Sequence, residues 1–559
     1  MASSIFRRKS LEKIIRDSEA GLGDAHEHKM RKVLGVRDLT FMGIAAVIGA
    51  GIFSTIGTAA FHGGPGVIFL FMITAVTCGF TALCYAEFAS RVPVAGSAYT
   101  YSYVSFGEVI AWVIGWALIL EYAIGNVVVA ISWSAYFNNI LNNMGIHLPD
   151  WLVIGYQSAK MTYQSALEAH KPVADSVFLN APEFAGIKFI INLPGFVIVM
   201  LITALAYIGI NESRKSANFM VTLKLVVLLF IAVIGFWLIF STGTTGNWKP
   251  FLPEGMAGVM QSVSSVFFAY IGFDAISTTA EECTNPQKDL PKGMMYSLLI
   301  CTVIYVVTAL VITGLVNYKE FEFVADPLAY VFEKINMHKI GFVISISAVI
   351  ASTSVLLVFQ IGQPRIWMSM SRDGLLPPVF GQISKRFKTP GFSTILSGIF
   401  VGLIVLVADD KLMTDLTSIG TLFAFVLVCG GVLYLPRTDK VPGKFSIPYL
   451  NGKFVIPVCL LIFAYASKHR IQTAVANLSG ESYQEILFLL FLVAAIIITI
   501  TTFRRNYSVI PVLGVLFCLY LMIEIPANSW KVFFEWMGVG LAIYLMYGRR
   551  KSKLAGRPG

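Results

Sequence analysis

The feature that most constrains this chain is a series of long apolar segments repeated along almost its whole length. A helix needs about 20 mainly apolar residues to cross a bilayer. Apolar residue types make up 56% of the chain and charged ones 13%, against about 25% charged in soluble proteins. The sequence therefore predicts an all-α polytopic membrane protein with about 14 transmembrane helices. The predicted spans lie near residues 38–60, 66–90, 109–141, 193–211, 216–241, 257–281, 294–317, 341–370, 392–408, 414–435, 453–468, 485–503, 508–525 and 530–548.

Basic residues are distributed unevenly between the loops that join these spans. With the N-terminus inside, the spans place about 30 Lys and Arg residues on the cytoplasmic side and about 11 outside, as the positive-inside rule requires. The net charge of +10 is explained in this way, without nucleic acid as a partner. We expect residues 1–36 to form a cytoplasmic segment and residues 549–559 a cytoplasmic tail. The expected location is the plasma membrane.

The sequence lacks the residue patterns that enzymes and metal sites need. All seven histidines fall outside the predicted spans, and neither a phosphate-binding loop nor a metal-ligand spacing occurs. The seven cysteines are scattered without a CxxC pair, which predicts free thiols packed as small apolar residues. We therefore expect no enzymatic activity, no metal and no cofactor. Without an ATP site, uphill transport would draw on an ion gradient or on exchange.

Glycines interrupt the first predicted span near its middle. Gly49 and Gly51 flank Ala50 about 12 to 14 residues from the cytoplasmic end, or roughly 18–20 Å at 1.5 Å per residue. If the helix unwinds there, its free backbone groups are tolerated only where they line a cavity or bind a ligand. The alternative is close helix packing, since glycine is common in membrane helices. The two glycines are two residues apart, however, and a GxxxG packing face needs a spacing of four.

The sixth predicted span carries a matching interruption. The interruption runs from Ala269 to Gly272, two small residues, and precedes Asp274 at a similar depth, on a helix of opposite direction. Each interrupted span opens a run of five, and such paired interruptions in two inverted halves indicate a transporter site. The sequence therefore predicts a core over residues 37–435 with discontinuous helices 1 and 6. Its five-plus-five inverted repeats would cover about 37–241 and 257–435, and residues 436–548 would add four helices.

Among the ionisable residues inside predicted spans, where an isolated charge is costly, three lie deep enough to suggest a functional role. Lys224 is roughly 13 Å deep and either acts in proton transfer or snorkels to the membrane surface. Glu121 lies at comparable depth and would pair with Lys224, face the substrate, or be protonated and bonded to a backbone carbonyl. Asp274 either sets the charge preference of the site or caps the half-helix that follows it.

Several short motifs spread over residues 33–551 resemble one family in combination. The motifs are Gly-Ala-Gly-Ile-Phe at 49–53, Tyr85-Ala-Glu-Phe88, Pro93-Val-Ala-Gly-Ser-Ala-Tyr99, Gly115-Trp-Ala-Leu-Ile-Leu-Glu-Tyr122, Phe268-Ala-Tyr-Ile-Gly-Phe-Asp274, Glu281-Glu-Cys-Thr-Asn-Pro-Gln287, Ser352-Thr-Ser354, Ser371-Arg-Asp-Gly-Leu-Leu-Pro377, Phe517-Cys-Leu-Tyr-Leu-Met522 and Tyr544-Leu-Met-Tyr-Gly548. Together they resemble the amino acid–polyamine–organocation transporter superfamily. Within it, they are most similar to the cationic amino acid transporter family, which fourteen spans also fit.

The resemblance implies a binding site for an α-amino acid at the paired interruptions. The substrate carboxylate would meet backbone N–H groups at a half-helix N-terminus, whose dipole favours anions, at Ala50, Gly51 and Ile52. The substrate ammonium would meet the carbonyls of Val47, Phe268 and Ile271. The rest of the site would be formed by Gly49, Ala269, Gly272, Glu121 and Asp274.

The same resemblance assigns roles to residues around this site. Lys224 would occupy the position where sodium sits in sodium-coupled relatives, close to the carbonyls of Ala45 and Ile48 and to Thr353. This position resembles that in proton-coupled members and argues against sodium. Phe53 or Phe268 would serve as an aromatic gate.

The sequence thus favours an amino acid permease that imports cationic or small neutral L-amino acids by proton symport. An exchanger that trades one amino acid for another is the alternative within transport. A membrane sensor on a transporter scaffold is a third possibility, although the chain has no large soluble signalling extension. The expected partners are a small-molecule amino acid, the proton and the lipid bilayer, and the sequence gives no indication of an accessory subunit.

Overall fold

The computed structural model describes residue 7 and residues 34–554, with the exception of 92–96, 169, 171, 175, 185, 210–213, 435–444 and 477–482. Most of the predicted N-terminal segment 1–36, part of the motif that begins at Pro93 and the end of the predicted tail lie outside these residues. All seven cysteines are among the described residues and are free thiols, as predicted.

The first half of the chain is built almost entirely of helices. A π-helix over Gly51–Thr55 and a short 3₁₀ turn over Gly64–Gly66 connect its first three α-helices. The α-helices are α2 Val36–Val47, α3 Ile56–Gly63, α4 Val67–Arg91, α5 Ser97–Ser105, α6 Glu108–Asn143, α7 Tyr156–Glu168, α8 Val177–Asn180, α9 Leu193–Ile208 and α10 Arg214–Thr242.

The second half repeats this pattern of long apolar helices with short connections. Its sixth predicted span is divided among α11, α12 and a 3₁₀-helix over Phe273–Glu282. The α-helices up to residue 434 are α11 Gly255–Met260, α12 Val263–Phe268, α13 Pro286–Leu315, α14 Pro327–Lys334, α15 His338–Arg372, α16 Gly391–Val407 and α17 Asp410–Tyr434. Those that follow are α18 Gly452–Ala466, α19 Lys468–Ala476, α20 Tyr483–Arg505, α21 Val509–Ile523, α22 Ala527–Ile543 and, after a π-helix over Tyr544–Gly548, α23 Arg549–Lys551.

Every predicted span coincides with a helix or a group of short helices, but not every one is a straight crossing. By length and apolarity, seven helical stretches in the described part of the chain are able to cross a bilayer, or nine if each of two bent pairs is one span. The bent pairs are α18 with α19, at 67°, and α21 with the α22–α23 stretch, at 112°. Three shorter apolar helical stretches, over Leu193–Ile208, Val263–Ser277 and Gly391–Val407, complete the set. The structure is therefore that of a polytopic, helical membrane protein.

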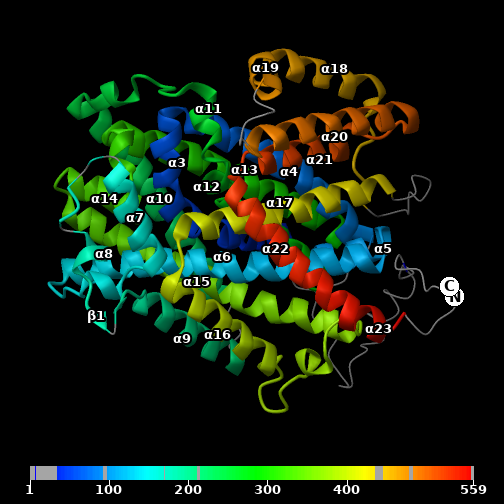
Figure 1. Ribbon diagram of the computed structural model, residues 1–559, viewed down its shortest axis with the longest axis horizontal. Coiled ribbons are helices and arrows are strands. Elements are labelled where there is room, and N and C mark those ends of the chain that lie inside the picture. Colours follow the sequence, from blue (N-terminus) through cyan, green and yellow to red (C-terminus); the bar gives the residue numbers. More distant parts are fainter. Residues whose placement is uncertain are drawn as a thin grey trace.

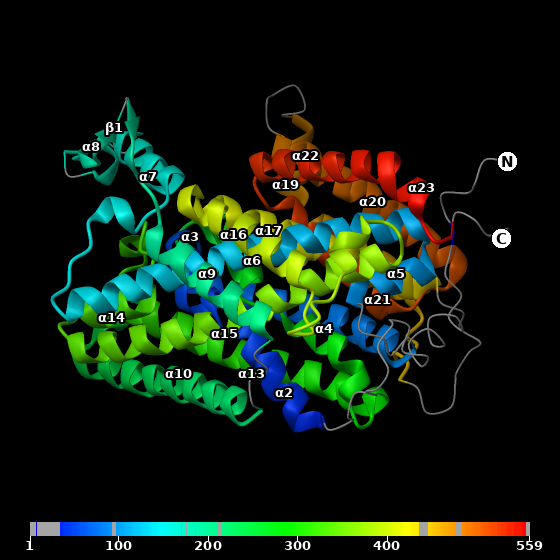
Figure 2. The same cartoon turned by 90° about the horizontal axis from the view of Figure 1, so that it is seen from below.

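The bundle is organised around α6 and α15, which pack against each other along the long axis of the molecule (Figure 1). Around this pair, α4 packs against α13, α9 against α16, and α17 against both α6 and α21. Helices α5 and α23 lie at one end of the bundle, and α7, α8 and α14 lie at the other in both views (Figure 2). Helices α18 to α20 lie on one flank, where α20 and its neighbours form a small apolar cluster of their own.

The segment between α6 and α9 departs from the all-α prediction in one small feature. Strands β1 Glu183–Phe184 and β2 Ile187–Lys188 pair antiparallel through a turn at Gly186, whose φ of +80° suits glycine. A separate apolar core that includes Ala159, Ala181 and Ile190 holds this segment together. Because only four of the described residues are in strands, the helical fold class stands.

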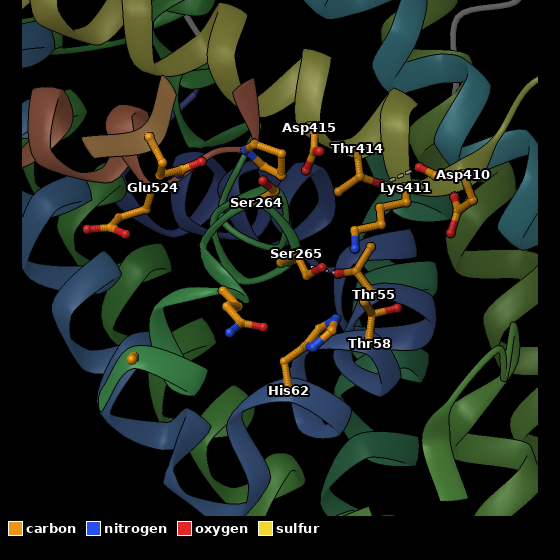
Figure 3. Close-up of a pocket in the computed structure, with 14 residues that line it drawn as sticks. Thr55, Thr58, His62, Ser264, Ser265, Asp410, Lys411, Thr414, Asp415 and Glu524 are labelled. Carbon is orange, nitrogen blue, oxygen red and sulfur yellow. Dashed lines mark hydrogen bonds between the residues drawn. The ribbon is translucent and has the colours of Figure 1, made fainter. Parts of the chain in front are cut away.

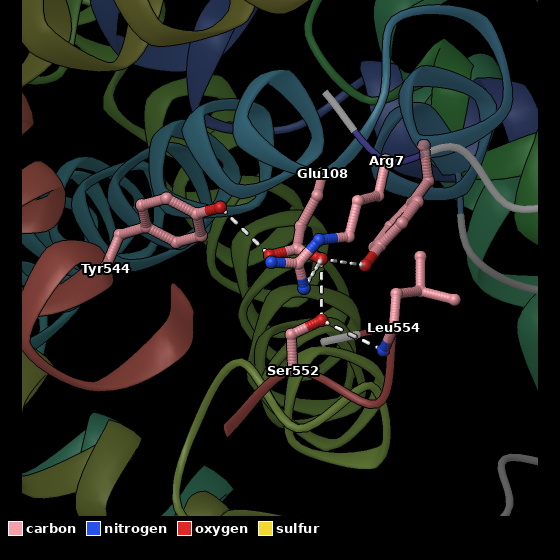
Figure 4. Close-up of polar contacts among 6 residues, drawn as sticks. Arg7, Glu108, Tyr544, Ser552 and Leu554 are labelled. Carbon is pink, nitrogen blue, oxygen red and sulfur yellow. Dashed lines mark hydrogen bonds and ion pairs between the residues drawn. The ribbon is translucent and has the colours of Figure 1, made fainter. Parts of the chain in front are cut away.

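One buried carboxylate ties the two ends of the chain together at the α5 end of the bundle. Glu108, the first residue of α6, accepts hydrogen bonds from the Tyr544 hydroxyl at 2.9 Å and the Ser552 hydroxyl at 2.6 Å (Figure 4). Tyr103 donates to the same carboxylate at 3.2 Å, and Arg7 lies 3.9 Å from it. Glu108 is 1% exposed, so its charge is held almost wholly by these partners.

Candidate functional site

The first helix is interrupted where the glycines predict it. Helix α2 ends at Val47, and Ile48 adopts an extended backbone with φ −78° and ψ 95°. Regular helix returns only through the π-helix Gly51–Thr55 and then α3. A Cβ on Gly49 would lie 2.6 Å from Val355 Cγ2, so close packing against α15 also requires glycine here. Gly49 therefore both lies in the interruption and packs closely against a neighbouring helix.

The second interruption is a sharp turn between α12 and the 3₁₀-helix Phe273–Glu282. The chain leaves the helix after Phe268 and turns at Gly272, whose φ is +113°. Only glycine adopts this backbone readily. A Cβ at this position would also lie 2.9 Å from the carbonyl oxygen of Ala46, so the turn presses against the end of α2.

The two interruptions touch each other, backbone against backbone. A Cβ built on Gly51 would lie 2.3 Å from Ala269 Cα, which leaves room for hydrogen alone. Tyr305 of α13 lies beside both: its hydroxyl oxygen is 2.8 Å from the carbonyl oxygen of Ala269 and 3.0 Å from that of Val47. The side chain is fully buried. Tyr305 thus provides one donor for two carbonyls that the interrupted helices leave free of their regular partners.

Lys224 reaches the first interruption from α10. Its Nζ lies 3.2 Å from the carbonyl oxygen of Ile48 and 3.4 Å from that of Ala45, the two carbonyls named by the resemblance. The side chain is 0% exposed, so it does not snorkel to a surface of the molecule. The hydroxyl of Thr353 donates to Val349 and accepts a hydrogen bond from Trp133.

The two predicted acidic residues lie close enough to interact electrostatically. Glu121 of α6 is near Asp274 and the side chain of Thr421 on α17. Asp274 lies in the first turn of the 3₁₀-helix and accepts hydrogen bonds from backbone N–H groups of its own turn, at Gly272 and Ala275. Both side chains are buried, at 4% and 3% exposure. The pairing of Glu121 with Lys224 stays a prediction.

The predicted aromatic gates are both buried. Phe53 packs edge-on against Tyr136 of α6, with ring centroids 6.1 Å apart and an interplanar angle of 88°. The Tyr136 hydroxyl also donates to the backbone carbonyl of Phe53, in the π-helix. Phe268 is 5% exposed and ends α12 directly before the second interruption. Each ring therefore adjoins one interruption.

A polar cavity of about 270 Å³ lies beyond the paired interruptions, on the side of α3 and α11 (Figure 3). Its inner wall includes Thr55, whose hydroxyl lies 2.7 Å from the carbonyl oxygen of Gly51 and 2.8 Å from that of Ser265. None of the predicted substrate-binding residues lines this cavity, and all of them are buried. Within the described residues, no group of three or more His, Cys, Asp or Glu side chains is placed to hold a metal ion.

Sequence reasoning missed the side chains that join the two interruptions. Tyr305 lies mid-span in the run Val303-Ile-Tyr-Val306, where a phenol needs a polar partner, and this was the available signal. Tyr136 had a similar signal in the third span. The polar cavity combines residues that are far apart in the sequence and come from several helices, so no local sequence pattern predicts it.

Comparison with known families shows which class of transporter has this architecture. Residues 34–518 match the amino acid permease family, and residues 507–552 match the C-terminal region of such permeases. The chain belongs to the amino acid permease family. This confirms the superfamily that the motifs indicate and makes the protein a membrane transporter of amino acids, not an enzyme.

Relatives of this amino acid permease match it over nearly its whole length. It is 36% identical to the branched-chain amino acid permease BcaP of Bacillus subtilis (strain 168), over 99% of this chain and 100% of that protein. It is 32% identical to the methylthioribose transporter of the same organism, over 99% of both chains. It is 31% identical to the vacuolar cationic amino acid transporter 4 of Arabidopsis thaliana, over 99% of this chain and 96% of that one.

Proposed function

We propose that this permease imports amino acids by alternating access and holds the α-amino and α-carboxyl groups of its substrate at the paired interruptions. The observation that carries the proposal is the backbone contact between Gly51 and Ala269 inside the bundle. The N–H groups of Ala50, Gly51 and Ile52 would take the carboxylate. The carbonyls of Val47, Phe268 and Ile271 would take the ammonium. The substrate would then share the Val47 carbonyl with Tyr305.

A five-plus-five inverted repeat with fourteen spans is the proposed architecture. Elements five predicted spans apart would be related by the repeat, and three such pairs pack together: α4 with α13, α6 with α15, and α9 with α16. The two interruptions form a fourth pair. We assign residues 37–435 to this core, residues 436–548 to four added helices, and residues 1–36 and 549–559 to the cytoplasm at the plasma membrane.

Proton coupling is proposed for Lys224. An ammonium between two carbonyls of the interrupted helix stabilises the extended turn at Ile48, and its deprotonation would weaken that hold. Proton binding and the shape of the first interruption would then be linked. The proposed polar surroundings of Lys224 and the substrate also include Thr353, Glu121 and Asp274. The proposed gates are Phe53 and Phe268.

Cationic or small neutral L-amino acids are the proposed substrates. Two carboxyl groups, Glu121 and Asp274, lie near the site and favour a positively charged side chain. Relatives are named for branched-chain and for cationic amino acids, so the family fold accommodates both classes. The class of amino acid side chain that the permease prefers is therefore the first property to measure.

The test is uptake by purified protein in liposomes, with a panel of labelled amino acids and an imposed proton or sodium gradient. Symport predicts uptake driven by an inward proton gradient into vesicles without internal amino acid. Exchange predicts uptake only when amino acid is loaded inside. Sodium-driven uptake that is indifferent to pH would contradict the role of Lys224. Full pH-dependent uptake by Lys224→Ala would contradict it too, whereas Arg365→Ala, on an exposed residue of α15, serves as the matched control.

A further inference from the structure

The polar cavity is separate from the paired interruptions and has its own charged groups. Its walls come from α3, α11, α12, the start of α17, and the ends of α20 and α21 that face it. Thr55 bonds across the boundary between the two sites, because its hydroxyl contacts both Gly51 and Ser265. A ligand in the cavity would therefore lie one helical turn from the interruptions without touching them.

Most of the acidic groups in the cavity already have partners. Glu524 forms an ion pair with Arg470. Asp415 accepts a hydrogen bond from Ser529 at 2.9 Å and another from Ser264. Asp415 therefore helps to hold α17 against α22 and α12, and Glu524 helps to hold the end of α21 against α19.

Asp410 differs from the other acids. Its Oδ1 is buried and has no hydrogen-bond partner among the described residues. A buried carboxylate oxygen without a donor is costly, because it has lost water and gained nothing in exchange. Asp410 is the first residue of α17, where an acidic side chain is favoured by the helix dipole, but this effect supplies no donor to Oδ1.

Lys411 places the opposite charge in the same cavity. Its side chain extends toward Ser265 and Thr55 while His62 lies on the far wall (Figure 3). Lys411 is exposed and forms no salt bridge with the residues that the structure describes. The cavity thus holds one unsatisfied carboxylate and one free ammonium, with polar groups of Thr58 and Gln261 around them.

We propose that this cavity is a second binding site for a free α-amino acid, occupied before the substrate reaches the paired interruptions. The substrate ammonium would donate to Asp410, and its carboxylate would bind Lys411. A zwitterion satisfies both groups at once, which a simple cation or anion does not. The volume of about 270 Å³ suits a small solute of this kind. This inference rests on the proposed function, because it takes the same substrate class.

The experiment is equilibrium dialysis of the purified full-length permease in nanodiscs, with the labelled amino acid that shows the fastest uptake in liposomes. The wild type is expected to bind two equivalents. Asp410→Asn is expected to bind one, and the apparent KM for uptake is expected to rise about tenfold, as for loss of a charge-assisted hydrogen bond. Lys411→Gln, on an exposed residue, should give the same loss and covers the case in which Asp410→Asn fails to fold.

Asp409→Asn is the matched control. Asp409 precedes Asp410 but does not line the polar cavity, and its Oδ1 caps Leu412 N at 2.8 Å, which an asparagine oxygen also does. This variant should bind two equivalents. One equivalent in the wild type, unchanged in Asp410→Asn and Lys411→Gln, would overturn the second site alone. A wild type that neither binds nor transports any amino acid would instead overturn the proposed function, and this inference with it.

Discussion

Gly51→Ala is the substitution that tests the contact between the two interruptions most directly. The added Cβ would lie 2.3 Å from Ala269 Cα and 2.9 Å from Ala269 Cβ. The first of these neighbours is backbone, so no side-chain rotation relieves the contact. Ordinary carbon contacts begin near 3.4 Å, and the two interruptions would have to separate by roughly 1 Å.

The size of the effect follows from what this separation breaks. Overpacking of this kind costs about 1–3 kcal/mol in stability. The Tyr305 hydroxyl lies between carbonyls on the two moving segments, so a shift of roughly 1 Å removes at least one of its hydrogen bonds. Where reacting groups must be positioned, a misplacement of 1 Å costs up to about 100-fold. We expect initial uptake to fall by about 10- to 100-fold, with the protein still folded.

The assay is initial uptake in liposomes, beside thermal unfolding in detergent. Gly79→Ala is the control, because a Cβ there meets only Met295 Cε at 3.9 Å. Alanine is about 1 kcal/mol better than glycine within a helix, so this variant should be at least as stable as the wild type and transport within twofold of it. Gly49→Ala, whose Cβ meets the Val355 side chain, should fall between the two. If Gly51→Ala transported at the rate of Gly79→Ala, the contact would have no role in transport.

Three further predictions concern other polar contacts. Tyr305→Phe should lose about 1–3 kcal/mol of stability and slow uptake, measured as above, because one buried donor serves two carbonyls; an unchanged melting temperature would contradict this. Glu108→Ala should speed tryptic cleavage after Arg549 to Lys551 about tenfold, since Tyr544 and Ser552 lose their acceptor, and wild-type cleavage kinetics would disprove the tie. Burial and nearby Glu333 raise the pKa of Asp326 to about 7. The protonated carboxyl therefore contributes to the free energy of unfolding near pH 4, and this contribution is lost as the pH rises through 7. Asp326→Asn should flatten the pH dependence of thermal unfolding over that window, and an unchanged slope would exclude Asp326 as its source.

The interruptions were predictable because their cause is local. Gly272 has a backbone that other residues adopt only with strain, and Gly51 leaves space that a side chain would fill. Lys224 was predictable for a related reason, since a lysine deep in an apolar span needs a polar partner. Its two carbonyl contacts, at Ala45 and Ile48, came from the family resemblance, and the structure places them at 3.4 and 3.2 Å.

Other features depend on which helices meet, and no local pattern contains that information. Tyr305 could have been singled out as a phenol in an apolar run, but not assigned to carbonyls on two other helices. The 112° bend between α21 and the α22–α23 stretch likewise separates two runs that composition alone reads as ordinary spans. Asp410 is an acidic residue in the first turn of α17, and its place in the cavity depends on residues from other helices.

Side chains from continuous helices donate hydrogen bonds to the backbone carbonyls around the first interruption. Lys224 of α10 holds Ala45 and Ile48, and Tyr305 of α13 holds Val47 together with Ala269. Of these four carbonyls, that of Val47 is also one of the three that the proposed substrate ammonium needs. Under the proposed function, a substrate and a proton would both act on this short turn and would influence each other through the same backbone. This shared turn links substrate binding to proton binding under the proposed coupling. When Lys224 or Tyr305 releases the carbonyl of Ile48 or Val47, the shape of the site changes for the other ligand.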